Sequence, residues 1–436
     1  MSLPTSIIEK TESKIAQDAT DKIAELSDPF IGISGLRNLV WPTVRGFLGR
    51  QKRRIFPPTV SEIQQPVIGF TTGSVKQLRK RALLIYLTPA FYRDPCELRM
   101  NGFVTALQSL EIAKALNRLG YIVDVIDYRD DKFIPTVHYD VCFGMHYNFG
   151  RLLPLFAEKK TTTIYYATGA YWEVENAAEQ ARCNNLKLRR GIETHLPLRL
   201  KPNQWVQLSD AVIAQGNDYV LDPYRMHSRR VFAIDHAASL SFPPDFEYKD
   251  LGPSARRNFL WFGSVGLLHK GLDVVLEAFL ELKELHLWVC GPLQSADERQ
   301  FVRAYRKELF HTPNIHPIGH ISIRSEAFRR LTDKCVATIH ASCADSMPGA
   351  VLDCMARGLI PLVSVESGMD TDGFGVTLEE SSVAEIRRAV VDLTNTPTDV
   401  CRQMAEEACR TASTRYTLTG FSSNIERILK DILMQT

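Results

Sequence analysis

The chain has 436 residues, which is long enough for two or three domains with cores of their own. Its hydrophobic fraction of 45%, aromatic fraction of 9% and charged fraction of 23% are those of an ordinary soluble globular protein, and a net charge of +2 gives no reason to expect nucleic acid as a partner. The nine cysteines are scattered without metal-binding or CxxC spacing. The stretch MSLPTSIIEK has no basic region followed by an apolar one, and no apolar run of about 18 residues suggests a membrane span. We therefore expect a reduced protein of the cytoplasm without a membrane span.

Residues 1–80 differ from the rest of the chain, and we expect them to form an N-terminal extension. An apolar pattern with helical spacing starts at a capping box, Ser6 with Glu9, and stops before Pro29. The stretch 41–56, WPTVRGFLGRQKRRIF, then combines five basic residues with aromatic and apolar ones and contains no acid. This composition predicts either a segment that lies on an anionic membrane surface, on the cytoplasmic face, or a solvated basic arm that packs on the protein.

From residue 81 onward, predicted strands alternate with predicted helices. In the range 81–235 the strands are ALLIYL, YIVDVID, DVCFGM, TTTIYYATG and AVIAQG, and a helix that ends at Gly120 joins the first two. This alternation predicts a parallel sheet covered by helices, with ligands at the carboxyl ends of the strands.

Residues 236–257 are rich in Pro, Ser and Gly and have no periodicity, which predicts a linker. A second alternating series occupies 258–410, with the strands NFLWFG, LHLWVCG, CVATIHAS and IPLVSV and the helix LDVVLEAFLEL, and an amphipathic C-terminal helix follows within 411–436. We therefore predict an α/β fold of two doubly wound, Rossmann-like domains that face a cleft.

Two carboxylates flank a loop of small residues in the stretch 344–358, ADSMPGAVLDCMARG. Ser346 suits a helix N-cap and Pro348 the first turn, so Asp345 stands just before the helix and Asp353 shares a face with the capping loop. The unpaired amides and the dipole of the helix N-terminus form an anion site between the two acids. Because carboxylates repel phosphate, we expect them to bind hydroxyl groups of the same ligand, which describes a nucleotide sugar. The alternative is a capped surface helix with two solvated acids.

A second loop of small residues follows the strand NFLWFG. Gly263, Ser264 and Gly266 turn the chain toward His269 and Lys270, ahead of a helix. Small residues let the backbone approach a ligand, and a lysine suits a phosphate as a point charge. The loop is neither a GxGxxG fingerprint nor a P-loop, and a tight turn with a solvated lysine is the alternative.

Together, about 75 residues apart and with LHLWVCGP between them, these two motifs resemble the donor-binding domain of GT-B glycosyltransferases, most closely the retaining group called family 4 or group 1. The resemblance is close over 258–366, looser over 81–235, and absent from the first 80 residues. It implies transfer of a glycosyl group from a nucleoside diphosphate sugar to an acceptor hydroxyl, with retention and without a metal or other cofactor. The acceptor that it implies, together with the basic segment, is a growing polysaccharide or a lipid-linked glycan.

The resemblance also implies roles for individual residues. Asp353 would hold the ribose hydroxyls and Asp345 would contact the donor sugar, although the family has Glu at both positions. Lys270 would be the cation of the diphosphate, Gly102 would approach the donor phosphates, and His146 would contact the transferred sugar, unless it is a packed histidine. The catalytic residues would thus be His146, Lys270 and Asp345. The other donor-binding residues would be Gly263, Ser264, His269, Ser346, Met347, Pro348, Gly349 and Ala350, with the amides of 347–350 on the diphosphate.

Ser264 stands where the family usually has an arginine beside the lysine, which removes a bidentate phosphate clamp. His269 is one candidate to replace that cation. These departures favour one alternative, a weak or inactive GT-B domain that binds nucleotide sugar or glycan as a scaffold. A phosphorylase or a nucleotide-sugar epimerase of the same fold is a further alternative. Asp370 and Asp372 form a DxD pattern like the metal site of GT-A enzymes, but the two-domain layout argues against that fold, and we expect no metal.

Aromatic and arginine side chains follow the strand TTTIYYATG. Aromatic faces and arginines suit sugar stacking and anionic acceptors. We therefore predict part of the acceptor site at Tyr171, Trp172, Arg189 and Arg190. Core aromatics and a solvated basic helix are the alternative.

Overall fold

The computed structural model describes residues 65–72, 80–100, 102–157, 160–194, 201–240, 251–252 and 254–434. The predicted N-terminal extension 1–80, with its basic stretch 41–56, lies mainly outside these described residues, and so do residues 241–250 and 253 of the predicted linker 236–257. The described residues belong to one compact unit, Ile63–Thr436. Among the described helices, none combines the length and the apolar character that a membrane crossing requires.

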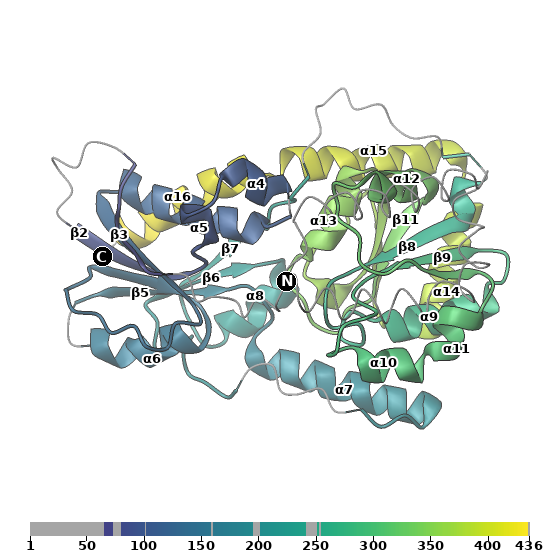
Figure 1. Ribbon diagram of the computed structural model, residues 1–436, viewed down its shortest axis with the longest axis horizontal. Coiled ribbons are helices and arrows are strands. Elements are labelled where there is room, and N and C mark those ends of the chain that lie inside the picture. The colour runs from purple at the N-terminus through teal and green to yellow at the C-terminus, as the bar shows by residue number, and fades with distance from the viewer. Residues whose placement is uncertain are drawn as a thin grey trace, which may run out of the picture. The chain divides into compact units, whose positions relative to one another are not determined.

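Seven strands form the first sheet, in the spatial order β1-β3-β2-β4-β5-β6-β7. Figure 1 shows α5 on one side of this sheet and α6 on the other. All neighbouring strands in it are parallel except β1, which runs antiparallel to β3. We call this sheet, with η2, α4, α5, α6 and α8, the N-lobe. Its elements are β1 (Val67–Phe70), β2 (Lys80–Tyr86), η2 (Pro89–Phe91), α4 (Pro95–Met100), α5 (Val104–Arg118), β3 (Tyr121–Asp127), β4 (Val141–Gly144), α6 (His146–Phe156), β5 (Thr162–Ala167), β6 (Ala211–Gln215), α8 (Asp218–Arg225) and β7 (Val231–Ile234).

Strand β2 shows why helices cover both faces of this sheet. Leu84 packs in one core cluster with Ile112 of α5, whereas Leu83 and Ile85 pack in another with Phe149 of α6. Successive side chains of a strand point to opposite faces, so a continuous apolar run such as ALLIYL needs cover on both sides. The predicted strand is therefore an interior strand, paired on one side with β3 and on the other with β4.

Six parallel strands form the second sheet, in the order β10-β9-β8-β11-β12-β13. We call this sheet and its helices the C-lobe. Its elements are η3 (Ala255–Arg257), β8 (Asn258–Phe262), α9 (Leu272–Glu281), β9 (His286–Cys290), α10 (Arg299–Ala304), α11 (Arg306–His311), β10 (Ile315–Pro317), α12 (Glu326–Lys334), β11 (Ala337–His340), α13 (Gly349–Ala356), β12 (Ile360–Ser364), η4 (Val365–Ser367), β13 (Val376–Leu378), α14 (Val383–Asn395) and α15 (Thr398–Thr414). The two doubly wound α/β units that the sequence predicts are thus both present.

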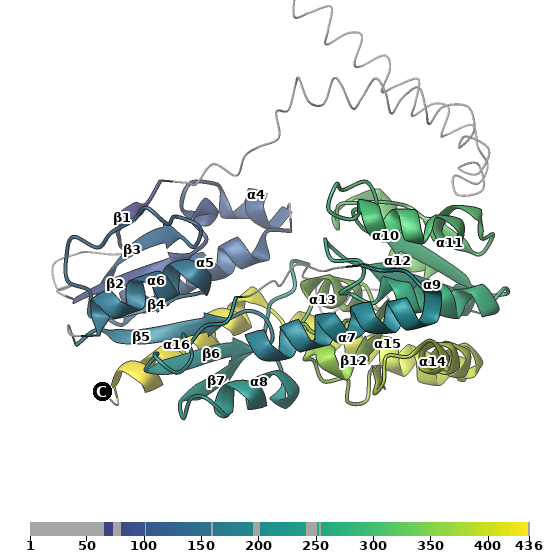
Figure 2. The same ribbon diagram turned by 90° about the horizontal axis from the view of Figure 1, so that it is seen from below.

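Two helices pack on the lobe opposite to the one that precedes them in the chain. Helix α7 (Trp172–Arg190) follows β5 of the N-lobe, but Cys183 and Leu186 on it are buried in the core of the C-lobe. Helix α16 (Leu418–Met434) follows α15 of the C-lobe, but Phe421 on it is buried with α5 in the core of the N-lobe. Figure 2 shows α16 along the N-lobe strands and α7 along the C-lobe helices. The lobes therefore share core-packed helices in addition to the site between them.

Candidate active site

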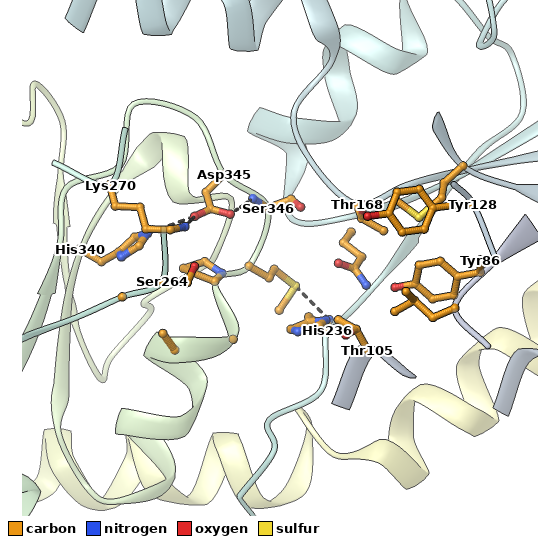
Figure 3. Close-up of a pocket in the computed structure, with 18 residues that line it drawn as sticks. Tyr86, Thr105, Tyr128, Thr168, His236, Ser264, Lys270, His340, Asp345 and Ser346 are labelled. Carbon is orange, nitrogen blue, oxygen red and sulfur yellow. Dashed lines mark hydrogen bonds and ion pairs between the residues drawn. The ribbon is translucent and has the colours of Figure 1, made fainter. Parts of the chain in front are cut away.

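A cavity of about 330 Å³ lies between the lobes, at the carboxyl ends of their strands (Figure 3). The C-lobe lines it with the loops after β8 and β11. The N-lobe lines it with Thr105 at the start of α5 and with residues at or just past the ends of β2 to β7. Doubly wound sheets bind ligands at this edge, and the volume is that of a small-molecule site. The N-lobe residues are Tyr86, Leu87, Thr105, Tyr128, Met145, Thr168, Gln215 and His236.

The structure brings together most of the site residues that the sequence predicts in the C-lobe. The two predicted loops, after β8 and after β11, line the same cavity although they are far apart in the sequence. Of the predicted residues, the cavity is lined by Gly263, Ser264, Lys270, Asp345, Ser346, Met347, Pro348, Gly349 and Ala350, whereas Gly102, His146, His269 and Asp353 do not line it.

Asp345 is the centre of a charged cluster in this cavity. Its Oδ2 lies 3.2 Å from Nζ of Lys270 and 3.1 Å from Nε2 of His340, and its Oδ1 accepts from the amide of Ser346 at 2.9 Å. Burial would raise the pKa of Asp345, but the ammonium of Lys270 and the hydrogen bond from His340 outweigh burial and hold the pKa of this carboxyl well below its usual range. Asp345 is therefore ionised and paired with Lys270.

Helix α13 presents its N-terminus to the cavity, but its first turn differs from the predicted one. The N-cap is Pro348, and Ser346 is not a cap, because Met347 takes a left-handed conformation with φ of 52° and its amide donates to the carbonyl of Ser367. Proline has no N–H, so two of the four predicted amides remain for an anion, those of Gly349 and Ala350, which the helix itself leaves unpaired. The buried hydroxyl of Ser346 also has no hydrogen-bond partner within the described part of the chain.

Asp353 lies behind the cavity instead of in it. Its Oδ1 accepts from the amides of Ser239 at 2.7 Å and Leu240 at 2.9 Å, in the segment that leaves the N-lobe after β7. The residue is only 5% exposed, and burial raises the pKa of Asp353 to about 6 despite these hydrogen bonds. The carboxylate of Asp353 therefore holds the segment after β7, which we call the crossing segment, against α13. This position does not support the predicted contact of Asp353 with ribose hydroxyls.

His269 is not placed to serve as a phosphate cation, as we had predicted that it could. Its Nδ1 lies 2.8 Å from Oε1 of Glu179 on α7, and both side chains are buried. This contact turns the ring toward α7 and away from the cavity. Among the described residues that line the cavity, Lys270 is the only lysine or arginine.

The two N-lobe residues with predicted roles lie beside the cavity. Gly102 has a φ of 76°, and a Cβ on it would sit 3.3 Å from the side chain of Ile323 of the C-lobe, so a larger residue there would be strained and would crowd Ile323. His146 begins α6 with a φ of 56°, and its ring lies 5.5 Å from that of Tyr128, which does line the cavity. Burial lowers the pKa of His146 to about 4, so the ring is neutral at pH 7.

The predicted acceptor arginines bind the C-lobe. Arg189 pairs with Asp273 at 2.6 Å and Glu277 at 3.0 Å, both on α9, and Arg190 pairs with Glu308 on α11 at 2.8 Å. These acids neutralise the positive charges that we had predicted for an anionic acceptor. The arginines instead fasten α7 to the C-lobe.

The predicted acceptor aromatics lie in the packed interior of the N-lobe. Tyr171 is buried, stacks on His227 with ring centroids 4.7 Å apart, and packs edge-on against Tyr224. Trp172 packs against the same core cluster. Both residues therefore fit the alternative prediction, that they are core aromatics, better than the prediction that they stack on a sugar.

Two histidines of the cavity were missed by the sequence analysis. His340 lies within the predicted strand CVATIHAS and ends the observed strand β11, so its position near a carboxyl strand end was a usable signal. His236 follows β7, a strand of four residues without a clear apolar pattern, and was assigned to the linker. No sequence signal pointed to it.

The DxD pattern does not gather a metal-binding cluster. Asp370 accepts from the side-chain amide of Asn217 at 3.0 Å, and both Asp370 and Asp372 are exposed. Within the described part of the chain, no group of three or more His, Cys, Asp or Glu side chains is arranged to hold a metal ion.

Two doubly wound lobes, a cavity at their strand ends, and a lysine and a helix N-terminus that line it together define the GT-B class of proteins. Residues 256–396 match the family model described as Glycosyl transferases group 1. The predicted resemblance is confirmed for these residues.

Solved structures support the same fold. The chain is similar to sucrose-phosphate synthase from Thermosynechococcus elongatus, with a TM-score of 0.56, 10% identity, and coverage of 82% of this chain and 100% of that one. It is also similar to HepE from Anabaena in complex with UDP and glucose, with a TM-score of 0.51 and 12% identity, and to a glycosyltransferase from Rickettsia africae, with a TM-score of 0.51 and 13% identity, each at 82% and 100% coverage. At these identities the likeness shows the fold alone. The comparison with curated proteins finds no match.

Proposed function

We propose that this protein transfers a glycosyl group from a nucleoside diphosphate sugar to an acceptor hydroxyl, as a glycosyltransferase of the hexosyltransferase type. The observation that carries the proposal is that Lys270 and the unpaired amides of Gly349 and Ala350 line one cavity between the lobes. A cation and a helix N-terminus suit an anionic leaving group, and the family match of residues 256–396 supports a sugar as the transferred group.

The chemistry that these residues perform is stabilisation of the departing diphosphate. As the bond between the anomeric carbon and the phosphate oxygen breaks, negative charge grows on the phosphate, next to Lys270 and the α13 amides. The acceptor oxygen bonds to the same face of the anomeric carbon, and its proton passes to the departing phosphate, so we propose retention of configuration without a general base from the protein. Asp345, ionised and held by three donors, is placed to accept a hydrogen bond from a hydroxyl of the donor sugar.

The donor and the acceptor are also proposals. HepE, which shares the fold, has been solved with UDP-glucose, so we propose a UDP-sugar as the first donor to test. For the acceptor we propose a growing polysaccharide or a lipid-linked glycan, which the protein would reach at the cytoplasmic face of a membrane through the basic stretch 41–56.

A thermal-shift screen against UDP-, GDP- and ADP-sugars tests donor binding. We expect one nucleotide class to raise the melting temperature of the wild type, because a ligand that binds only the folded state stabilises it. The shift is expected to vanish in Lys270→Ala and to persist in Lys283→Ala, an exposed lysine outside the cavity. If Lys270→Ala responds as the wild type does, the phosphate role of Lys270 is wrong.

A binding scaffold is the second candidate function. Ser264 lines the cavity without any charge, and Asp353 binds backbone amides instead of facing the cavity, so the site has fewer ligand contacts than the resemblance implies. Stabilisation by a nucleotide sugar without release of the nucleoside diphosphate, with glycan acceptors present, would favour this candidate over transfer.

A further inference from the structure

His236 lies where the chain leaves the N-lobe, two residues after β7. The residue is 8% exposed and lines the cavity, and its backbone amide donates to the sulfur of Met347 at 3.4 Å (Figure 3). The Nε2 edge of the ring faces Gly349, since a Cβ on that glycine would sit 3.1 Å from Nε2. The crossing segment thus brings an imidazole nitrogen to the N-terminus of α13.

The hydrogen-bond partner of Nδ1, the other ring nitrogen, determines whether Nε2 of His236 is a donor or an acceptor. Nε2 of Gln108, a buried residue of α5, lies 2.9 Å from Nδ1 of His236. An amide nitrogen only donates, so Nδ1 accepts, and a neutral ring carries its proton on Nε2, the nitrogen that faces Gly349. Burial lowers the pKa of His236 to about 4, so the ring is neutral at pH 7. His236 is therefore a hydrogen-bond donor held beside the free amides.

The cavity is short of positive charge for a diphosphate. Lys270 is paired with Asp345, and Ser264 next to it cannot carry a charge. A diphosphate carries more negative charge than one lysine neutralises. A further hydrogen-bond donor that points at the phosphates would therefore stabilise a diphosphate in this cavity.

We propose that His236 binds the diphosphate of the donor, with its Nε2–H donating to a phosphate oxygen next to the amides of Gly349 and Ala350. Gln108 is a positioning residue, because it sets the tautomer that makes this donation. Oε1 of Gln108 is buried and has no hydrogen-bond partner among the described residues. If the bound phosphate brings a second proton to the ring of His236, a flip of the Gln108 amide would let Oε1 accept a hydrogen bond from Nδ1. This inference rests on the proposed function and concerns the same site.

Two substitutions separate the two ring nitrogens. The side chain of His236→Asn reaches only the position of Nδ1, so it keeps a contact with Gln108 and removes the donor that faces Gly349. The side chain of His236→Gln reaches the position of Nε2 and keeps a donor there. His227→Phe, a histidine that stacks on Tyr171 away from the cavity, is the matched control.

Isothermal titration with UDP, GDP and ADP selects the diphosphate that the wild type binds best, and the matching nucleoside is titrated in parallel. We expect His236→Asn to weaken diphosphate binding about 10- to 100-fold, as for the loss of a hydrogen bond to a charged group, and His236→Gln to stay within about threefold of the wild type. Nucleoside affinity is expected to be unchanged in both variants. A wild type that binds none of the diphosphates contradicts the proposed function, whereas an unchanged His236→Asn, or an equal loss for the nucleoside, overturns only the role of His236.

A measurement on the wild type keeps the inference testable if His236→Asn does not fold. Histidine rings labelled with ¹³C are observed by NMR during titration with the same diphosphate and nucleoside. We expect one ring resonance, absent from His236→Gln, to shift with the diphosphate and not with the nucleoside. If that resonance does not respond to the diphosphate, His236 does not bind phosphate.

Discussion

Asp345 competes with any anion that enters the cavity for the charge of Lys270, and Asp345→Asn separates these two interactions. Nζ of Lys270 lies 3.2 Å from Oδ2 of Asp345. Two unit charges at that distance attract each other by about 5 kcal/mol at an effective dielectric constant of about 20, and desolvation offsets much of this attraction. Release of only about 1.4 kcal/mol to an incoming phosphate strengthens its binding tenfold. We therefore expect Asp345→Asn to bind UDP about tenfold more tightly than the wild type does.

The surroundings of Asp345 can accommodate this substitution. The new side chain keeps an oxygen for the amide of Ser346 but turns a donor toward His340. Nδ1 of His340 has no hydrogen-bond partner in the described structure, so the ring can move its proton to that nitrogen and accept with Nε2. The variant is therefore expected to fold with the cavity intact.

The same substitution is expected to slow glycosyl transfer, because the carboxylate that we place on the donor sugar is lost. Isothermal titration with UDP measures the first effect, and release of UDP from the UDP-sugar measures the second. In a Lys270→Met background the gain in UDP affinity should shrink, since no lysine remains to be freed. Weaker or unchanged UDP binding by Asp345→Asn would refute the reasoning.

Three further predictions concern other parts of the chain. Burial raises the folded-state pKa of Asp353 to about 6, above the unfolded value, so the contribution of Asp353 to the free energy of unfolding falls as pH rises from about 4 to about 6. Urea unfolding should show that Asp353→Asn removes this loss, which is at most about 3 kcal/mol. An identical pH dependence of the free energy of unfolding in both proteins would contradict this prediction. Asp273→Asn removes an acid that pairs with Arg182 and Arg189 of α7, and it should lower the free energy of unfolding by about 3 kcal/mol. The control Glu326→Gln, at an exposed ion pair, should leave the free energy of unfolding nearly unchanged. Equal effects of the two substitutions would argue against the attachment of α7 to the C-lobe through these arginines. Flotation of the full chain with anionic liposomes should fall when the four basic residues of 50–54 become Ser, and unchanged flotation would rule out the membrane contact.

The sequence predicts the features of this protein that depend on local patterns. The strand ALLIYL is visible as an apolar run because both of its faces are covered, and the two small-residue loops are visible because close approach to a ligand restricts residue size. Those loops meet in one cavity, as their positions at strand ends lead one to expect. Gly358 follows the C-terminus of α13 with a φ of 72°, a conformation that favours glycine and so leaves a local signal in the sequence.

Features that depend on contacts between distant segments could not be predicted. From the sequence alone, Arg189 is typical of a solvated residue in a basic helix. In the structure it pairs with Asp273 of α9, which lies 84 residues further along the chain. Asp353 reads as a cavity residue until Ser239 binds it from 114 residues away. His236 carries no motif, and its role follows only from the place where β7 ends.

Release of nucleoside diphosphate from UDP-, GDP- and ADP-sugars, with and without glycan acceptors, tests the central claim most directly. We predict that the wild type and Lys283→Ala release one nucleoside diphosphate, faster with an acceptor, and that Lys270→Ala loses this release by at least about 100-fold, as for the loss of a charged contact to the leaving group. Release by Lys270→Ala at the wild-type rate, or no release by the wild type from a donor that it binds, would contradict the assignment of this cavity to glycosyl transfer.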